Sequence, residues 1–157
     1  MPMSPITLAN EIAALPLTLD VTVAINGWTN AWINYFAASS AGPVPCVKPV
    51  LETTPKLLMA AAMTGMATAG AAALQAGILA FWGGVASLAT AVYPTATTVT
   101  PPPGLAELSA ALIPVFIANT TGKLSKIDSA VAIANVMHPL NLGGTAVIVA
   151  PPPVPIL

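Results

Sequence analysis

The sequence predicts a mostly α protein: a small helical bundle with short extended, proline-terminated β segments near residues 97–100 and 145–150. Three observations support this class. The stretch from Leu57 to Ala106 carries no charged residue and is rich in alanine, leucine and methionine, which are strong helix formers. Large aromatic residues between positions 28 and 36 recur at helical spacing. The runs that favour strand are short, and prolines end them.

The N-terminal third predicts one substantial helix. Residues 1–16 contain several prolines and are expected to form an arm with one helical turn around residues 8–14. Residues 17–38 follow as a helix, although the alternation at its start also fits a strand. Its aromatic stripe of Trp28, Trp32 and Phe36 is expected to be buried in the core. Prolines then predict a loop over residues 39–49.

The charge-free central stretch is expected to be helical as far as Val92. Thr54 and Pro55 suit a helix start, because threonine accepts free N–H groups and proline fits the first turn. We expect one long helix, or two helices joined near Gly70 or Gly83.

The C-terminal third alternates extended and helical segments. Pro101–Pro103 favours polyproline II geometry before a helix that Pro114 should kink. Ser125 followed by Asp128 matches a capping box and predicts another helix start. The predicted elements are an extended segment at 97–100, helices at 105–119 and 126–137, and a strand at 145–150.

Two runs, TTVT and VIVA, each stand directly before three prolines. Because proline cannot donate a ladder hydrogen bond, it ends strand pairing. The two runs are expected either to pair with each other or to pair with strands of neighbouring subunits.

The composition indicates burial against partners. Hydrophobic residues make up 56% of the chain and charged residues 6%, against about 25% charged residues in an ordinary soluble domain. We therefore expect a single helical domain over 1–157, with a proline-rich arm at 1–16 and a proline-rich tail at 145–157 that works between subunits. The candidate subunit-interface residues are Gly65, Gly70, Gly77, Val147, Ile148, Val149, Pro151, Pro152 and Pro153.

Few residues of the sequence are candidates for catalysis or for binding a ligand, metal or nucleic acid. The chain has no arginine and only four lysines, which excludes the basic footprint of a nucleic-acid-binding protein. His138 is the only histidine and Cys46 the only cysteine, so no metal-site spacing exists. The glycine pairs lack the spacing of a phosphate-binding loop. We expect no catalytic, cofactor-binding or metal-ligating residue, and a structural role for His138 at a helix C-terminus.

A membrane protein is the alternative. The central stretch is long enough for two close-packed transmembrane helices, at 57–74 and 76–93. Against this alternative, only Gln75 separates the two segments, and the flanks lack the lysine and arginine cluster that orients membrane helices.

Four sequence features together resemble small virion structural proteins of tailed bacteriophages, particularly marine and cyanobacterial phages. They are FWGG at 81–84, TVTPPPG before the predicted helix at 105, the segment SKIDSAVAIANVMHP, and the strand TAVIVAPPP. The resemblance implies a non-enzymatic structural subunit located in the virion. Its partners would be other copies of itself and other virion proteins, with a membrane as partner only under the alternative.

Overall fold

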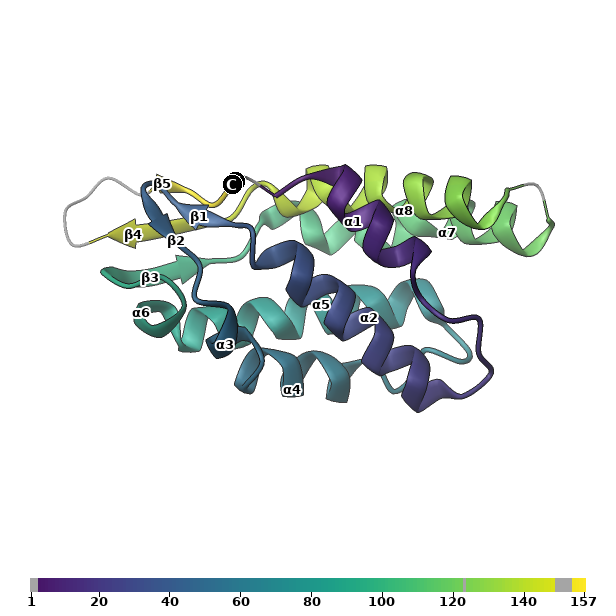
Figure 1. Cartoon of the computed structure of the whole chain (residues 1–157), viewed down its shortest axis with the longest axis horizontal. Helices are drawn as coiled ribbons and strands as arrows, with labels where there is room; N and C mark the ends of the chain where they lie inside the picture. The colour runs from purple at the N-terminus through teal and green to yellow at the C-terminus, as the bar shows by residue number, and fades with distance from the viewer. Residues whose placement is uncertain (1–2, 123, 149–153) are drawn as a thin grey trace.

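The computed structural model describes residues 3–122, 124–148 and 154–157. Figure 1 shows an elongated molecule whose longer helices run along the long axis, while the short strands gather at one end. Most described residues are helical, so the predicted mostly α class is confirmed. The helices are α1 (Pro5–Ala13), α2 (Val21–Phe36), α3 (Lys48–Leu51), α4 (Thr54–Ala62), α5 (Gly70–Ser87), α6 (Ala89–Val92), the 3-10 helix η1 (Pro103–Glu107), α7 (Leu108–Thr120) and α8 (Lys126–Asn141).

The N-terminal segment forms helix α1, where we expected an arm with a single helical turn. The Ser4 hydroxyl starts this helix by accepting the Ile6 N–H at 3.2 Å. Leu8, Ala9 and Ile12 are buried, and α1 packs against α8 and α2. The segment is therefore part of the core.

Helix α2 begins at Val21, later than the predicted start at residue 17. One Asp20 carboxylate oxygen accepts the N–H groups of Thr22 at 2.9 Å and Val23 at 3.1 Å. This cap satisfies donors that the first helical turn leaves free, so the helix starts after Asp20 and the preceding residues form a loop.

The aromatic stripe of α2 faces the core, as predicted for two of its three members. Trp32 and Phe36 are buried, whereas Trp28 is only half-buried. Phe36 lies edge-on to Phe81 and Trp82 of α5, with ring centroids 5.0 Å apart in both pairs. These contacts join α2 to α5 at the centre of the molecule.

The central stretch folds as a pair of helices, α4 and α5, joined by residues 63–69. The predicted break near Gly70 is confirmed, but Gly83 and Gly84 lie inside α5. The proposed span at 57–74 is wrong as a single helix, because α4 ends at Ala62 and α5 packs back against it. Packing between the two halves thus outweighs the helix preference of the uninterrupted sequence.

The helix start predicted at Ser125 is confirmed, but the Asp128 carboxylate bonds the Ser125 hydroxyl where a full capping box would bond the Ser125 backbone N–H. The Ser125 oxygen accepts the Asp128 N–H at 3.1 Å, and the Ser125 hydroxyl donates to the Asp128 carboxylate at 2.7 Å. The helix continues beyond the predicted end at Met137 and passes through Pro139. Met137 and Asn141 are both buried one turn apart, so packing of this face extends the helix past the proline.

The strands form two small antiparallel sheets: β1 (Ser40–Ala41) with β2 (Val44–Pro45), and the order β3 (Ala96–Thr100), β4 (Thr145–Ile148), β5 (Val154–Pro155). The register places Thr98 opposite Val147 and Thr100 opposite Thr145. Of the two predicted alternatives, pairing of the two proline-terminated runs with each other is confirmed.

The tail prediction needs correction. Val147 and Ile148 of β4 pair with β3 of the same chain, and β5 covers the other edge of β4. Leu157 and Ser40 exchange backbone hydrogen bonds of 3.1 and 3.2 Å. The β4 strand therefore finds its ladder partners inside the subunit, and removing residues 145–157 is expected to destabilise the fold itself. Four of the subunit-interface candidates lie outside the described residues: Val149, Pro151, Pro152 and Pro153.

Ile156→Ala is expected to lower the free energy of unfolding by about 2–5 kcal/mol, because the Ile156 side chain is fully buried. Urea denaturation measures the change. The matched control is Leu157→Ala, because Leu157 is 48% exposed and should change stability by less than about 0.5 kcal/mol. Equal effects of the two substitutions would show that the tail does not belong to the subunit core.

Candidate functional site

His138 forms a hydrogen bond within the subunit. Its Nδ1 atom lies 2.7 Å from the hydroxyl of Tyr35. Burial raises the pKa of Tyr35 and lowers the pKa of His138. Both shifts favour the neutral forms of the phenol and the imidazole, and the imidazole tautomer determines which of the two groups donates. This bond ties the last turn of α8 to α2, which is a structural role for His138.

Cys46 lies in a second internal polar cluster. Burial raises the pKa of its thiol to about 12, so the reactive thiolate is disfavoured. Beside it, the hydroxyls of Ser39 and Tyr93 lie 2.6 Å apart. Among the described residues, no three histidine, cysteine, aspartate or glutamate side chains gather in a way that could hold a metal ion.

The three glycines named as subunit-interface candidates lie in different environments within the subunit. A Cβ on Gly77 would come against Met63 of the preceding connection, with the sulfur at 2.8 Å, and a Cβ on Gly70 would lie 3.3 Å from Phe116 of α7. At Gly65 no described atom lies within 4 Å of the Cβ position, so its place at a subunit interface stays a prediction. It stands in the connection at 63–69 rather than on a packed helix face.

Gly84 of α5 lies against the backbone of another helix. A Cβ on Gly84 would lie 2.7 Å from the Cα atom of Pro55 and 3.0 Å from its nitrogen. These are backbone atoms at the start of α4, so they cannot move aside as a flexible side chain could. Gly84 thus allows α4 and α5 to approach closely.

Gly84→Ala is expected to destabilise the protein by about 1–3 kcal/mol, because overpacking against backbone outweighs the better helix propensity of alanine. The adjacent Gly83 provides the control: it is exposed, and no described atom lies within 4 Å of its Cβ position. Gly83→Ala should therefore stabilise α5 by about 0.5–1 kcal/mol. Chemical denaturation measures the change in unfolding free energy for both variants. The two changes should have opposite signs, and changes of the same sign would contradict the contact at Gly84.

The most unusual surface of the molecule lies on α7. We call the exposed side chains of Ala110, Ile113, Pro114 and Ile117 the α7 face; they recur at helical spacing and include no charge. Ile113 is 48% exposed and Ile117 58% exposed. Two described segments are long and apolar enough to cross a membrane, Gly70–Ser87 and Pro103–Thr120. Only 17% of the second segment is buried, and Ile113 and Ile117 are its exposed large apolar side chains.

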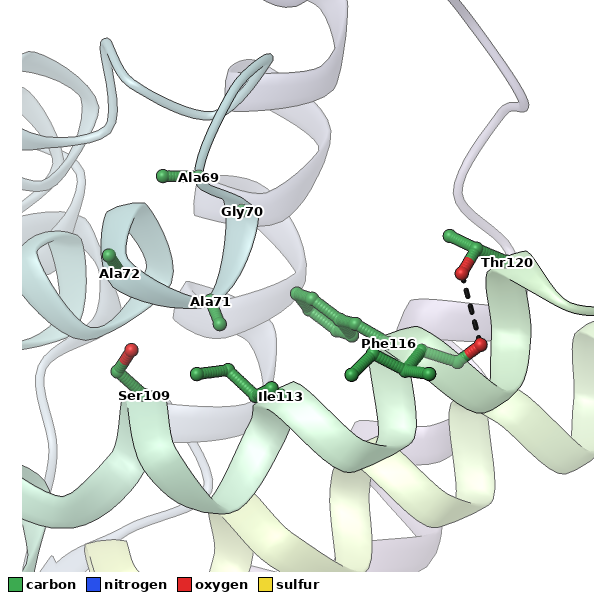
Figure 2. A pocket seen from close by; sticks show the side chains of 9 residues that line it. Ala69, Gly70, Ala71, Ala72, Ser109, Ile113, Phe116 and Thr120 are labelled. Carbon is green, nitrogen blue, oxygen red and sulfur yellow. Dashed lines mark hydrogen bonds between the residues drawn. The ribbon is translucent and has the colours of Figure 1, made fainter.

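An apolar groove of about 300 Å³ lies between the α7 face and the start of α5. Figure 2 shows Phe116 and Ile113 of α7 reaching toward Gly70 and Ala71 of α5. The groove is lined by Ala69, Gly70, Ala71, Ala72, Ser109, Ile113, Phe116, Ile117 and Thr120, none of which is charged. Only glycine and small alanine side chains line this side of the groove (Figure 2).

Gln75 holds the two walls of the groove together. Its side-chain oxygen accepts the backbone N–H of Ser109 at 2.6 Å, which satisfies a free donor in the first turn of α7. The polar residue that separates the two charge-free segments in the sequence is therefore an anchor between helices.

Comparison of the chain with protein-family models, with curated proteins and with solved structures finds no match. The α7 face and its groove are thus the features from which a function can be argued.

Proposed function

We propose that this protein is a non-enzymatic structural subunit of a large protein assembly, a tailed-phage virion. The observation that carries the proposal is the α7 face. Its isoleucines stand in solvent on a helix without charge, next to an apolar groove. On soluble proteins, a contiguous exposed apolar surface marks a site of interaction with a partner.

The distribution of charge supports the same proposal. No charged residue occurs between Leu57 and Ala106, a stretch that includes all of α5, and α7 contains none. A solvated domain carries charges on every side, since they keep it soluble and monomeric. Much of α5 is already buried inside the subunit, and partner subunits would cover the α7 face and remove its isoleucines from water.

The phage particle is the assembly that the sequence resemblance favours. The partners would be other copies of the chain and other virion structural proteins. The non-enzymatic part of the proposal is supported by His138 and Cys46, because one is hydrogen-bonded internally and the other is held as a thiol by burial.

The test is mass spectrometry of phage particles purified without detergent, compared with the membrane fraction of the infected cells. The proposal expects peptides of this chain in the particles, at a constant ratio to known structural proteins through successive gradients. Peptides confined to the membrane fraction would refute it.

A small integral membrane protein is the second candidate, and the low burial of Pro103–Thr120 favours it. This segment and α5 pack against each other and would replace the spans first proposed at 57–74 and 76–93. Pro114 weighs against it: because proline has no N–H, the exposed Ala110 carbonyl loses its helical donor, which is costly in lipid. A protein that stays dispersed only in detergent would favour this candidate.

A further inference from the structure

A cavity with one polar side lies at the end of the molecule opposite the strands. Figure 1 shows that the connection between α1 and α2 lies at this end, as does the place where α7 ends and α8 begins. The cavity has a volume of about 350 Å³. Small-molecule sites in proteins begin at about 300 Å³, so a compact organic ligand fits. We call it the Trp28 cleft; its lining includes Ile12, Trp28, Asn119, Lys126, Ser129 and Ile133.

The polar side of the Trp28 cleft presents hydrogen-bond donors. Ser129 is 5% exposed, and its hydroxyl donates to the Asn119 side-chain oxygen at 2.9 Å. Because this bond occupies the amide oxygen, Asn119 offers its amide N–H groups to a ligand. Lys126 is exposed and supplies the one charge in the described lining. Both groups donate and one is cationic, so this side of the cleft suits an anion.

No carboxylate competes for these donors within the described lining of the cleft. Asp128 follows Lys126 by two positions on α8, and residues two apart on a helix do not face each other. The Asp128 carboxylate instead accepts the Ser125 hydroxyl at 2.7 Å. The positive charge of Lys126 is therefore directed to the cleft without a neighbouring acid in its lining.

The other side of the cleft is apolar. Ile12 and Ile133 are buried side chains of α1 and α8 that line it. Trp28 is half-buried, unlike Trp32 and Phe36 of the same stripe, so part of its ring is open to a ligand. An aliphatic chain that lies along these side chains leaves water, which stabilises a complex.

The charge distinguishes the Trp28 cleft from its neighbours on the surface. The groove between α5 and α7 has no charged residue in its lining, and neither has a smaller hollow of about 180 Å³ between the α1–α2 connection and α2. Of these three, only the Trp28 cleft combines an apolar side with a cation. It therefore selects a ligand that is both apolar and anionic.

We propose that the Trp28 cleft binds an aliphatic carboxylate, the chemistry of a free fatty acid. The carboxylate accepts from Lys126 and from the Asn119 amide, and the aliphatic chain lies against Trp28, Ile12 and Ile133. An inorganic anion would leave the apolar side in water, and a plain hydrocarbon would leave the lysine without a partner. The lining includes none of the side chains of the α7 face, so the inference goes beyond the proposed function and is independent of it.

Isothermal titration calorimetry of the full chain with decanoate tests the inference, in detergent-free buffer below the concentration at which decanoate forms micelles. One decanoate should bind per chain. Decanol and decylamine carry the same chain with a neutral or a cationic head, and each should bind at least about threefold more weakly. Decanoate with bromine on its chain should quench part of the tryptophan fluorescence, because Trp28 lines the cleft while Trp32 and Trp82 are buried elsewhere.

Lys126→Met removes the ammonium group and keeps the apolar stem of the side chain. It should weaken decanoate binding by about threefold to tenfold and leave decanol binding unchanged. Lys126→Arg keeps the charge and should retain decanoate binding. Lys56→Met is the matched control, because Lys56 lies on α4 and does not line the cleft. Circular dichroism checks that each variant keeps the fold.

Three results would overturn the inference: no binding of decanoate to the wild type, equal affinities for decanoate and decanol, or equal effects of Lys126→Met and Lys56→Met on decanoate binding. Each of them leaves the proposed function standing, because assembly through the α7 face does not use the cleft. Absence of the chain from purified particles would refute the proposed function and leave ligand binding at the Trp28 cleft unaffected.

Discussion

Trp32→Ala is expected to lower the free energy of unfolding by about 3–5 kcal/mol, measured by urea denaturation at fixed protein concentration. Trp32 is 1% exposed and packs against Tyr35 and Phe81, with ring centroids at 5.2 and 6.3 Å. Truncation would leave a large cavity between α2 and α5, which the surrounding helices can only partly fill. A change below about 1 kcal/mol would contradict the buried position.

Trp32→Phe separates the packing of this side chain from its polar group. The indole N–H of Trp32 has no hydrogen-bond partner among the residues that the structure describes. An unpaired buried donor costs about 1–3 kcal/mol, so phenylalanine removes this cost while it retains part of the ring volume. Trp32→Phe should therefore lower the free energy of unfolding far less than Trp32→Ala.

The parts of the fold that were predictable depend on residues that are close together in the sequence. Ser125 caps α8 by accepting the Asp128 N–H within one helical turn, and Trp32 and Phe36 share a helix side through their spacing. The two proline-terminated runs were recognisable as strands for the same reason, although their pairing with each other was only one of two alternatives.

The contacts that could not be predicted join residues that are distant in the sequence and meet only in the folded chain. Gly65 and Gly84 are both glycines in one charge-free stretch, yet only Gly84 meets the backbone of Pro55. Helix α1 was predicted as only one turn, because its stability comes from burying Leu8 and Ile12 against distant helices. The prolines near it in the sequence indicated an irregular arm instead. The groove was missed because it needs α5 and α7 side by side.

Substitution of Trp82 is the second change expected to reduce stability strongly. Unlike Trp32, Trp82 has a hydrogen-bond partner for its indole N–H. It is fully buried, and its indole N–H donates to the Asn141 side-chain oxygen at 2.8 Å. Asn141 is itself fully buried at the end of α8, so this bond ties α5 to α8. Trp82→Ala should cost about 3–5 kcal/mol for the cavity, and about 1–3 kcal/mol more for the unpaired Asn141 oxygen.

Trp82→Phe isolates the polar part of this cost. Phenylalanine keeps an aromatic ring against Phe36, but it leaves the Asn141 oxygen without its donor in a buried site. Trp82→Phe should therefore destabilise the protein by about 1–3 kcal/mol more than Trp32→Phe, where no partner is orphaned.

The decisive measurement is a double-mutant cycle with Asn141→Leu. Leucine removes the buried oxygen while it fills a similar space, so Trp82→Phe should be much less costly in that background. The expected coupling between positions 82 and 141 is about 0.5–3 kcal/mol. The same cycle between Trp32→Phe and Asn141→Leu should give a coupling near zero. Equal couplings at both tryptophans would mean that the Trp82–Asn141 bond does not hold α5 to α8, because only Trp82 has Asn141 as its partner.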